Sequence, residues 1–236
     1  YDIGSVHVMF GSELEIENNK SFAVTQQPDI AEFDVEDTRR EIILRSSCLS
    51  VTVNKKAGYI SLLDKSGKLL LKEWPEKARM NVHGDSVNAY CRFQLQDEEA
   101  LYGLGQFRDN LMNLRNAKRE LVQFNTQAAV PVIYSTGKWG LFWDNPSRTI
   151  YADNNAGMSF VSDYGRIVNY YLFVGDGMDK LVAAYRSLTG VAPMLPAWAL
   201  GYHQSRNRYA TQKEVMEVAK RMKEETGCDG IMVARG

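Results

Sequence analysis

The chain has 236 residues, of which 44% are hydrophobic and 24% are charged, a composition typical of a globular protein with room for one large domain or two smaller ones. The formal net charge of −1 excludes the strongly basic surface that nucleic acids or anionic membranes select. No apolar run approaches the roughly 20 residues that span a bilayer, so the sequence predicts a soluble protein without a nucleic acid or membrane partner, and leaves periplasm and cytoplasm open.

Most of the chain has the pattern of short strands and turns. The polar segment 13–34 predicts no more than a mobile first strand with its loop. β-branched residues then predict strands within Glu41–Val53 and Gly58–Asp64, and the sequence KSGK at Lys65–Lys68 predicts the turn that follows. This succession is typical of β-hairpins.

The same pattern continues through the middle of the chain. In Tyr90–Gln96, alternation predicts that Cys91, Phe93 and Leu95 face a core. Further strands are predicted between Gly, Asn, Asp and Pro residues, at Arg119–Phe124, Pro131–Ser135, Trp139–Trp143, Arg148–Ala152, Gly157–Ser162 and Ile167–Val174. Many short strands at close spacing predict a mainly β protein, built as a sandwich or barrel of antiparallel sheets.

The first helical period comes late, in residues 177–190. Its apolar face consists of Leu181, Tyr185 and Leu188, and it ends at Gly190. An extended linker, Val191–Trp198, follows and is stiffened by two prolines. We therefore predict a β-sandwich domain over residues 1–190 and a second domain over residues 191–236.

The second domain has a different pattern. Trp198–His203 reads as a strand, Thr211–Glu214 as a capping box that opens a helix, Gly227 as the αL cap of that helix, and Cys228–Val233 as a buried strand. Strand, helix and strand form a βαβ unit, the repeat of a parallel barrel. A closed (β/α)8 barrel needs about eight such units, so we expect this one to be the first βαβ unit of a truncated TIM barrel.

The helix of the second domain carries an apolar stripe, formed by Val215, Val218, Ala219 and Met222. A lone βαβ unit would leave that stripe and a parallel strand edge uncovered. The sequence therefore predicts that residues 210–236 are less ordered than the sandwich or self-associate with another copy of the chain.

No motif of a common catalytic or cofactor site occurs. The segment Tyr102–Phe107 has two glycines but lacks the third of a nucleotide-binding fingerprint, so we expect a turn that requires small residues for packing. G-x-S-x-G, H-E-x-x-H, the Walker lysine loop and the calcium-loop pattern are also missing. We expect no cofactor.

The potential metal ligands are scattered, namely Cys48, Cys91, Cys228, His7, His83 and His203. Their number and spacing fit neither a disulfide framework nor a metal site, so the cysteines are expected to be small core residues. Four aspartates offer acid–base chemistry, namely Asp109, Asp144, Asp153 and Asp163. Nothing brings any two of them together, and we interpret them as turn or surface carboxylates.

Aromatic and amide side chains suggest a neutral sugar as ligand, because aromatic faces stack on sugar C–H surfaces and planar amides bind hydroxyls. Such residues gather in Gln123–Gln127, Trp143–Asn145 and His203–Tyr209, although tryptophans more often belong to a core. At the end of a first barrel strand, Arg206 and Tyr209 would line a pocket mouth. Alternatively, Arg206 pairs with a nearby carboxylate and Tyr209 covers the next helix.

Four segments carry a resemblance: LYGLGQF with ELVQFNTQ, GLFWDN, YYLFVG with KLVAAYRSLTG, and PMLPAWALGYHQSRNRYATQKEV. Over about Leu101–Val233 the chain resembles glycoside hydrolase family 31, which includes α-glucosidases, α-xylosidases and transglycosylases. The resemblance implies a galactose mutarotase-like β-sandwich followed by a (β/α)8 catalytic barrel. It also implies a retaining mechanism, with two carboxylates about 5 Å apart.

The resemblance further assigns substrate-binding residues. The loop containing Asn125, Thr126 and Gln127 matches the family loop that leans over the active site, and Tyr209 matches an aromatic wall of the subsite for the non-reducing sugar. Both catalytic carboxylates of the family lie on later barrel strands, and no matching motif occurs here, so no catalytic residue is expected in this chain and we predict no activity for it alone. Residues 234–236 depart from the acidic pattern expected after the second strand.

The leading hypothesis is therefore the N-terminal part of a retaining α-glycosidase that hydrolyses terminal α-linked glucose from oligosaccharides. An α-xylosidase or α-glucosyltransferase of the same family, or a non-catalytic carbohydrate-binding sandwich, remain alternatives. An epimerase would need a histidine and a glutamate in the concave face. The short connection between Asn145 and Tyr170 leaves no space for an inserted accessory domain, which favours an α-glucosidase.

Overall fold

A computed structural model divides the chain into two compact units, Tyr1–Val191 and Ala192–Gly236. It describes residues 4–25, 31–75, 79–83, 86–201 and 206–227.

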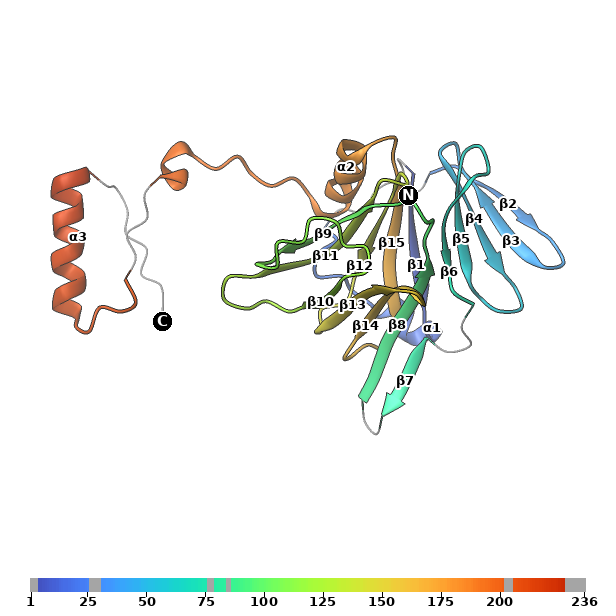
Figure 1. Cartoon of the computed structure of the whole chain (residues 1–236), viewed down its shortest axis with the longest axis horizontal. Helices are drawn as coiled ribbons and strands as arrows, with labels where there is room; N and C mark the ends of the chain where they lie inside the picture. Colours follow the sequence, from blue (N-terminus) through green and yellow to red (C-terminus); the bar gives the residue numbers. More distant parts are fainter. Residues whose placement is uncertain (1–3, 26–30, 76–78, 84–85, 202–205, 228–236) are drawn as a thin grey trace. The chain divides into compact units, whose positions relative to one another are not determined.

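The first unit contains two antiparallel sheets (Figure 1). The five-stranded sheet has the order β1 (Ser5–Phe10), β15 (Val168–Val174), β12 (Trp139–Trp143), β11 (Ala128–Ser135) and β9 (Leu101–Gln106). The ten-stranded sheet has the order β10 (Lys118–Leu121), β13 (Thr149–Asn154), β14 (Gly157–Ser162), β8 (Ser86–Gln94), β6 (Leu69–Glu73), β5 (Ile60–Asp64), β4 (Leu49–Asn54), β3 (Glu41–Arg45) and β2 (Asp34–Asp37), with β7 (Met80–His83) paired to β8. The predicted antiparallel sandwich is thus confirmed.

The core between the sheets is aromatic. Trp143 of β12 stacks on Phe160 of β14 with ring centroids 5.4 Å apart, and Tyr170 of β15 meets Phe93 of β8 edge-on at 5.5 Å. Trp139 is also fully buried. Alternation along the strands places these rings inward, so the expectation that the tryptophans of β12 are core residues is confirmed.

A charged group is buried in the same core. The carboxylate of Glu73 accepts hydrogen bonds from Arg79 (2.7 and 2.9 Å), from the Tyr170 hydroxyl (2.6 Å) and from the Cys91 thiol (3.2 Å). These bonds satisfy a charge that would otherwise be costly to bury. Cys91 is a core residue as predicted, but Cys48 is exposed, because it lies in the turn between β3 and β4 rather than on a strand.

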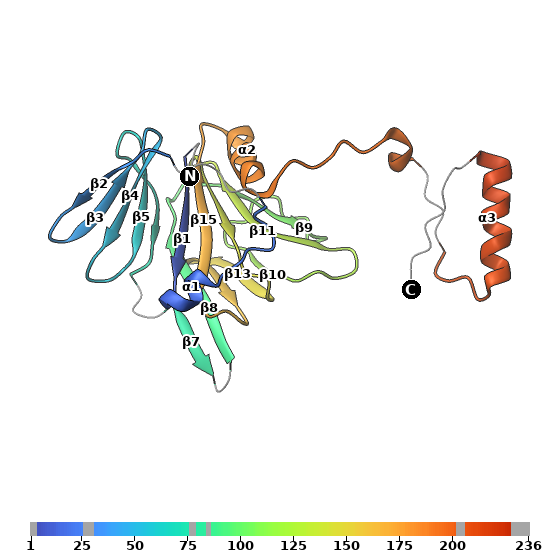
Figure 2. The same cartoon turned by 180° about the vertical axis from the view of Figure 1, so that it is seen from behind.

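Helix α2 (Met178–Thr189) covers the outer face of the five-stranded sheet (Figure 2). Its buried residues Leu181, Ala184 and Leu188 pack against a sheet face that includes Phe142 and Tyr171. The predicted apolar face is confirmed for the two leucines, and Tyr185 of the same face packs against the cluster while half-buried.

The first predicted strand is wrong. Glu13–Glu17 form a short helix, α1, with Ser12 as its N-cap: the Ser12 hydroxyl accepts a hydrogen bond from the Glu15 N–H (3.4 Å) and donates one to the Glu15 carboxylate (2.9 Å). Residues 26–30 lie outside the described part of the chain.

The turn predicted at Tyr102–Phe107 is also wrong, because Leu101–Gln106 form strand β9. Its backbone has positive φ angles at Gly103, Leu104 and Gly105, and the register with β11 shifts between Ala129 and Ile133. The requirement for small residues is real, since a Cβ at Gly105 would collide with the carbonyl oxygen of Ala128. The turn-like backbone is therefore an irregularity within a strand.

In the second unit the predicted helix is confirmed as α3 (Gln212–Thr226). The Thr211 hydroxyl accepts a hydrogen bond from the Glu214 N–H (3.2 Å), the Glu214 carboxylate accepts one from the Ala210 N–H (2.7 Å), and Gly227 has a φ of 67°. Both ends of the helix thus have the expected caps.

The strand predicted at Trp198–His203 is wrong for the residues that the structure describes, which end at Gly201. Ala197–Leu200 make a 3-10 helix, η1, closed by a hydrogen bond from the Ala199 N–H to the Pro196 carbonyl (2.9 Å). No described residue from Ala192 onward forms a strand, so this segment has no β partner there. The strand predicted at Cys228–Val233 and residues 234–236 lie outside the described residues.

Candidate functional site

The loop that the sequence singles out, Gln123–Gln127, connects β10 to β11. Its shape is held by Gln123, whose side-chain amide donates to the Gln127 carbonyl (2.6 Å) and accepts from the Ala129 N–H (3.4 Å). Thr126 has a φ of 71°, which is rare for a β-branched residue and costs energy. The loop therefore contains one residue with a strained backbone, and the Gln123 hydrogen bonds tie it to the start of β11.

The three predicted substrate-binding residues of this loop are Asn125, Thr126 and Gln127. Asn125 and Thr126 are exposed and Gln127 is half-buried. Among the described residues, none forms a hydrogen bond with the side chains of these three. Two amides and a hydroxyl are thus available to an external ligand with hydroxyl groups.

A surface pocket of about 330 Å³ lies beside the loop. Its lining is Phe107, Arg108, Asp109, Lys118, Arg119, Glu120, Phe124 and Gln127. Of the three predicted substrate-binding residues in the loop, Gln127 alone lines this pocket. The Phe124 ring, which is 58% exposed, adds an aromatic surface to its wall.

An ion pair forms one side of this pocket. The Arg119 guanidinium donates from Nε and Nη2 to the two carboxylate oxygens of Asp109, both at 2.7 Å, and lies over the Phe107 ring at 4.6 Å. These hydrogen bonds hold the pKa of Asp109 below its ordinary value. The carboxylate is therefore ionised and fixed in orientation.

A second pocket, of about 370 Å³, shares Phe107 and Arg119 with the first. Its other lining residues are Tyr102, Gly103, Gly105, Gln106, Leu111 and Met112. The close approach of β9 to β11 that the glycines permit thus also shapes this surface. Phe107 and Arg119 were not predicted as site residues, because a contact between a loop and β10 leaves no local pattern in the sequence.

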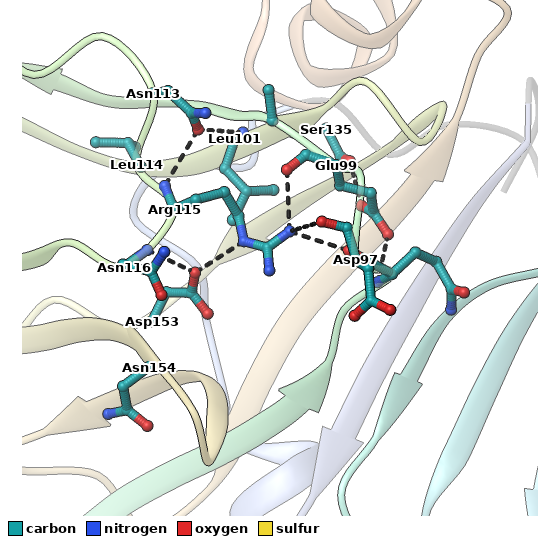
Figure 3. A network of polar contacts seen from close by, with 12 residues as sticks. Asp97, Glu99, Leu101, Asn113, Leu114, Arg115, Asn116, Ser135, Asp153 and Asn154 are labelled. Atoms are coloured by element: carbon teal, nitrogen blue, oxygen red, sulfur yellow. Dashed lines mark hydrogen bonds and ion pairs between the residues drawn. The ribbon is translucent and has the colours of Figure 1, made fainter.

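The loop between β9 and β10 carries Asp109 and is anchored by a polar network (Figure 3). Arg115 donates to the Asp153 carboxylate (2.9 Å) and to the backbone carbonyls of Gln96 and Glu99 (both 3.0 Å). The Asn113 side chain accepts from the Leu101 and Arg115 N–H groups (3.0 and 3.1 Å). These bonds fix the base of the loop relative to the sandwich.

The four aspartates interpreted as turn or surface carboxylates have separate partners. Asp109 pairs with Arg119, Asp153 with Arg115, and Asp163 with Arg148, while Asp144 accepts a hydrogen bond from Asn169. The interpretation is wrong for Asp153, which is only 5% exposed and satisfies the N–H of Asn116 as well as Arg115. Burial raises the pKa of Asp144.

The other two predicted sugar-binding segments contain Trp143–Asn145 and His203–Tyr209. Trp143 is fully buried and cannot stack on a ligand, and Asn145 bonds to Ser147 and to the Tyr164 carbonyl. In the second unit the Arg206 guanidinium lies over the Tyr209 ring at 5.6 Å. The residues between His203 and Arg206 fall outside the described part.

Within the described ranges, no cluster of three or more His, Cys, Asp or Glu side chains is arranged to hold a metal ion. No helix of that part is both long and apolar enough to cross a bilayer.

Two family models match the chain. Residues 2–151 match the glycosyl hydrolase 31 N-terminal galactose mutarotase-like domain, and residues 192–233 match the TIM-barrel domain of glycosyl hydrolases family 31. The chain belongs to glycoside hydrolase family 31. The fold expected from the resemblance, a mutarotase-like sandwich followed by the start of a TIM barrel, is thereby confirmed.

Known members of the family are similar over most of the chain. An α-xylosidase of Saccharolobus solfataricus is 31% identical over 225 residues, which are 91% of this chain and 30% of the relative. Alpha-glucosidase 2 of Bacillus thermoamyloliquefaciens is 28% identical and is covered to 29%. The crystal structure of a family 31 α-xylosidase from a soil metagenome, complexed with xylose, matches 95% of this chain and 36% of its own with a TM-score of 0.80 and 27% identity. The chain thus spans about a third of the length of such relatives.

Proposed function

We propose that this chain is the N-terminal part of a retaining α-glycosidase and that it forms one wall of the sugar site without providing the chemistry. The observation that carries the proposal is the strained loop Gln123–Gln127, whose outer side chains have no hydrogen-bonding partner among the described residues and lie beside a pocket with an aromatic wall. Strain of this kind is concentrated at functional sites. Family membership makes an α-linked oligosaccharide the expected ligand.

In this proposal Asn125, Thr126 and Gln127 hydrogen-bond sugar hydroxyls. Arg206 and Tyr209, in the second unit, are also proposed to bind substrate: the Arg206 guanidinium lies over the Tyr209 ring, and the ring offers an aromatic face to the non-reducing sugar. We assign the sandwich to residues 1–190 and the linker with the start of the barrel to residues 191–236.

The substrate we propose is a terminal α-linked glucose. α-Xylosidase activity is the second candidate, because an α-xylosidase is 31% identical and the solved α-xylosidase with 27% identity is complexed with xylose. Glucose has a hydroxymethyl group (C6) on C5 that xylose lacks. The relative affinity for the two methyl α-glycosides therefore measures whether the chain contributes to that choice.

The chain by itself is proposed to be catalytically inactive. A retaining glycosidase needs two carboxylates about 5 Å apart, and each aspartate considered above is engaged with a different partner.

The apolar stripe of α3, namely Val215, Val218, Ala219 and Met222, has no buried member, so we also propose weak self-association through this face.

An NMR titration with methyl α-D-glucopyranoside and methyl α-D-xylopyranoside tests the loop. We expect saturable binding that Gln127→Ala weakens about fivefold, since a hydrogen bond contributes about 1 kcal/mol. The matched control is Gln94→Ala, a half-buried glutamine that lines neither pocket. Equal affinities of the wild type and Gln127→Ala would refute the role of the loop.

A further inference from the structure

The carboxylate of Asp109 has a hydrogen-bond acceptor position that no described residue fills. Its Oδ1 accepts two hydrogen bonds, from Arg119 Nη2 (2.7 Å) and from the Leu111 N–H (3.1 Å), whereas within the described residues Oδ2 accepts one, from Arg119 Nε (2.7 Å). Each carboxylate oxygen offers about two acceptor positions. One strong acceptor position therefore remains on Oδ2.

Asp109 is one of the residues that line the pocket. The Arg119 side chain is 5% exposed and that of Asp109 is 33% exposed, so Asp109 is the member of the ion pair that a ligand can reach. Because Arg119 is buried and lies over the Phe107 ring, the carboxylate is held in place before a ligand arrives. Such preorganisation reduces the entropic cost of binding.

The pocket has the chemistry of a sugar subsite. It combines the fixed charge of Asp109 with the exposed ring of Phe124 and the amide of Gln127. An aromatic face suits the C–H surface of a sugar, while a carboxylate and an amide suit its hydroxyls. A volume of about 330 Å³ is at the lower end of the range for small-molecule sites.

We propose that Asp109 is a sugar-binding residue, which accepts a hydrogen bond from a hydroxyl of a neutral carbohydrate held between Phe124 and Gln127. This inference rests on the proposed function, because it takes the same class of ligand, but it adds a charged acceptor to the uncharged loop side chains that are proposed to bind the sugar. A hydrogen bond to a charged acceptor is about twice as strong as a neutral one. Asp109 then contributes more to affinity than any single loop amide.

The test is a ¹H–¹⁵N NMR titration of the 236-residue chain with methyl α-D-glucopyranoside and isomaltose. The Leu111 backbone amide reports on Asp109, to which it is bonded, and the side-chain amides of Asn125 and Gln127 report on the loop. We expect all three signals to shift with one dissociation constant, and the shifts to persist in 0.5 M NaCl, since a neutral sugar is not displaced by salt.

Asp109→Asn should weaken binding about tenfold, as expected for a hydrogen bond to a charged group. The control is Asp163→Asn, because Asp163 also accepts two hydrogen bonds from one arginine, Arg148, but lines neither pocket. Thermal unfolding of both variants separates lost affinity from lost folding.

The outcomes separate this inference from the proposed function. Shifts at Asn125 and Gln127 without a shift at Leu111 would overturn the role of Asp109 and leave the loop in place. A shift at Leu111 alone would do the reverse. A Leu111 signal that neither sugar shifts, or a shift that 0.5 M NaCl abolishes, would overturn the inference.

Discussion

Gly105 shows how single residues decide the geometry of the site. Its φ is 93° and a side chain there would meet the carbonyl oxygen of Ala128. The sequence predicted the need for a small residue in this segment but assigned a turn instead of a strand. The local pattern of glycines reports backbone freedom, whereas membership of a sheet depends on the partner strand β11, which is distant in the sequence.

We expect Gly105→Ala to destabilise the first unit by about 2 kcal/mol or more, because the methyl group forces β9 and β11 apart and φ is unfavourable. Urea-induced unfolding measures the change. The control Gly67→Ala shares a positive φ of 85° but has no atom within 4 Å of the added methyl, and should cost about 1 kcal/mol. Equal effects of the two substitutions would show that the close approach is not rigid.

His7 makes the stability of the sandwich depend on pH. Its Nε2 lies 2.6 Å from Asn169 Oδ1, and Asn169 in turn donates to Asp144 (3.0 Å), while the imidazole stacks on Tyr171 at 4.0 Å. Burial lowers the pKa of His7, and the hydrogen bond with Asn169 opposes this in part. The folded state therefore binds a proton at His7 less readily than the unfolded state does.

The contribution of His7 to stability should be fully present above about pH 6.5. It should be lost as the pH falls from there toward the lower folded-state pKa, because the unfolded chain takes up the proton first, with a slope of at most about 1.4 kcal/mol per pH unit. Free energies of unfolding between pH 5 and 8 should thus vary less in His7→Gln than in the wild type. Parallel pH profiles of the two proteins would contradict this assignment.

At the scale of elements, agreement between prediction and structure differs from strand to strand. β12 and β14 were predicted to the residue, since their side chains pack in the core. β2, with the sequence DVED, is exposed at every position and forms only because β3 offers it hydrogen bonds. Such an edge strand has no hydrophobic signal in its own sequence.

The ends of a helix were predicted correctly where the helix itself was recognised in the sequence. The caps of α3 are those that the sequence implied, yet the N-cap Ser12 was overlooked, because the short polar segment after it has no apolar stripe. Caps are local chemistry, and the sequence therefore contains them in full.

We expect Thr211→Ala to weaken the first turn of α3 by about 1 kcal/mol, because the Glu214 N–H loses its acceptor. Hydrogen exchange at Glu214 and Val215 should become about fivefold faster. Gln212→Ala, in the same turn, should leave these rates unchanged or slower, since alanine favours helix. Unchanged exchange in Thr211→Ala would mean that the cap does not stabilise the helix.

At the scale of the whole molecule, fold and function were predictable to different depths. Strand patterns predicted the sandwich, and family motifs predicted the loop at Asn125–Gln127. The ion pair of Asp109 and Arg119 could not be predicted from the sequence, because only tertiary packing brings the β9–β10 loop against β10. The second unit shows the limit of local patterns, since Ala197–Leu200 have the composition of a strand but form a 3-10 helix.

The central claim is that this chain recognises a sugar but does not cleave it. The most direct measurement is the release of 4-nitrophenol from 4-nitrophenyl α-D-glucopyranoside and α-D-xylopyranoside by the purified chain, at concentrations where the methyl glycosides bind. We predict no release above that of buffer. Release in proportion to protein concentration, and abolished by Gln127→Ala, would show that the chain contains a complete active site and would contradict the account.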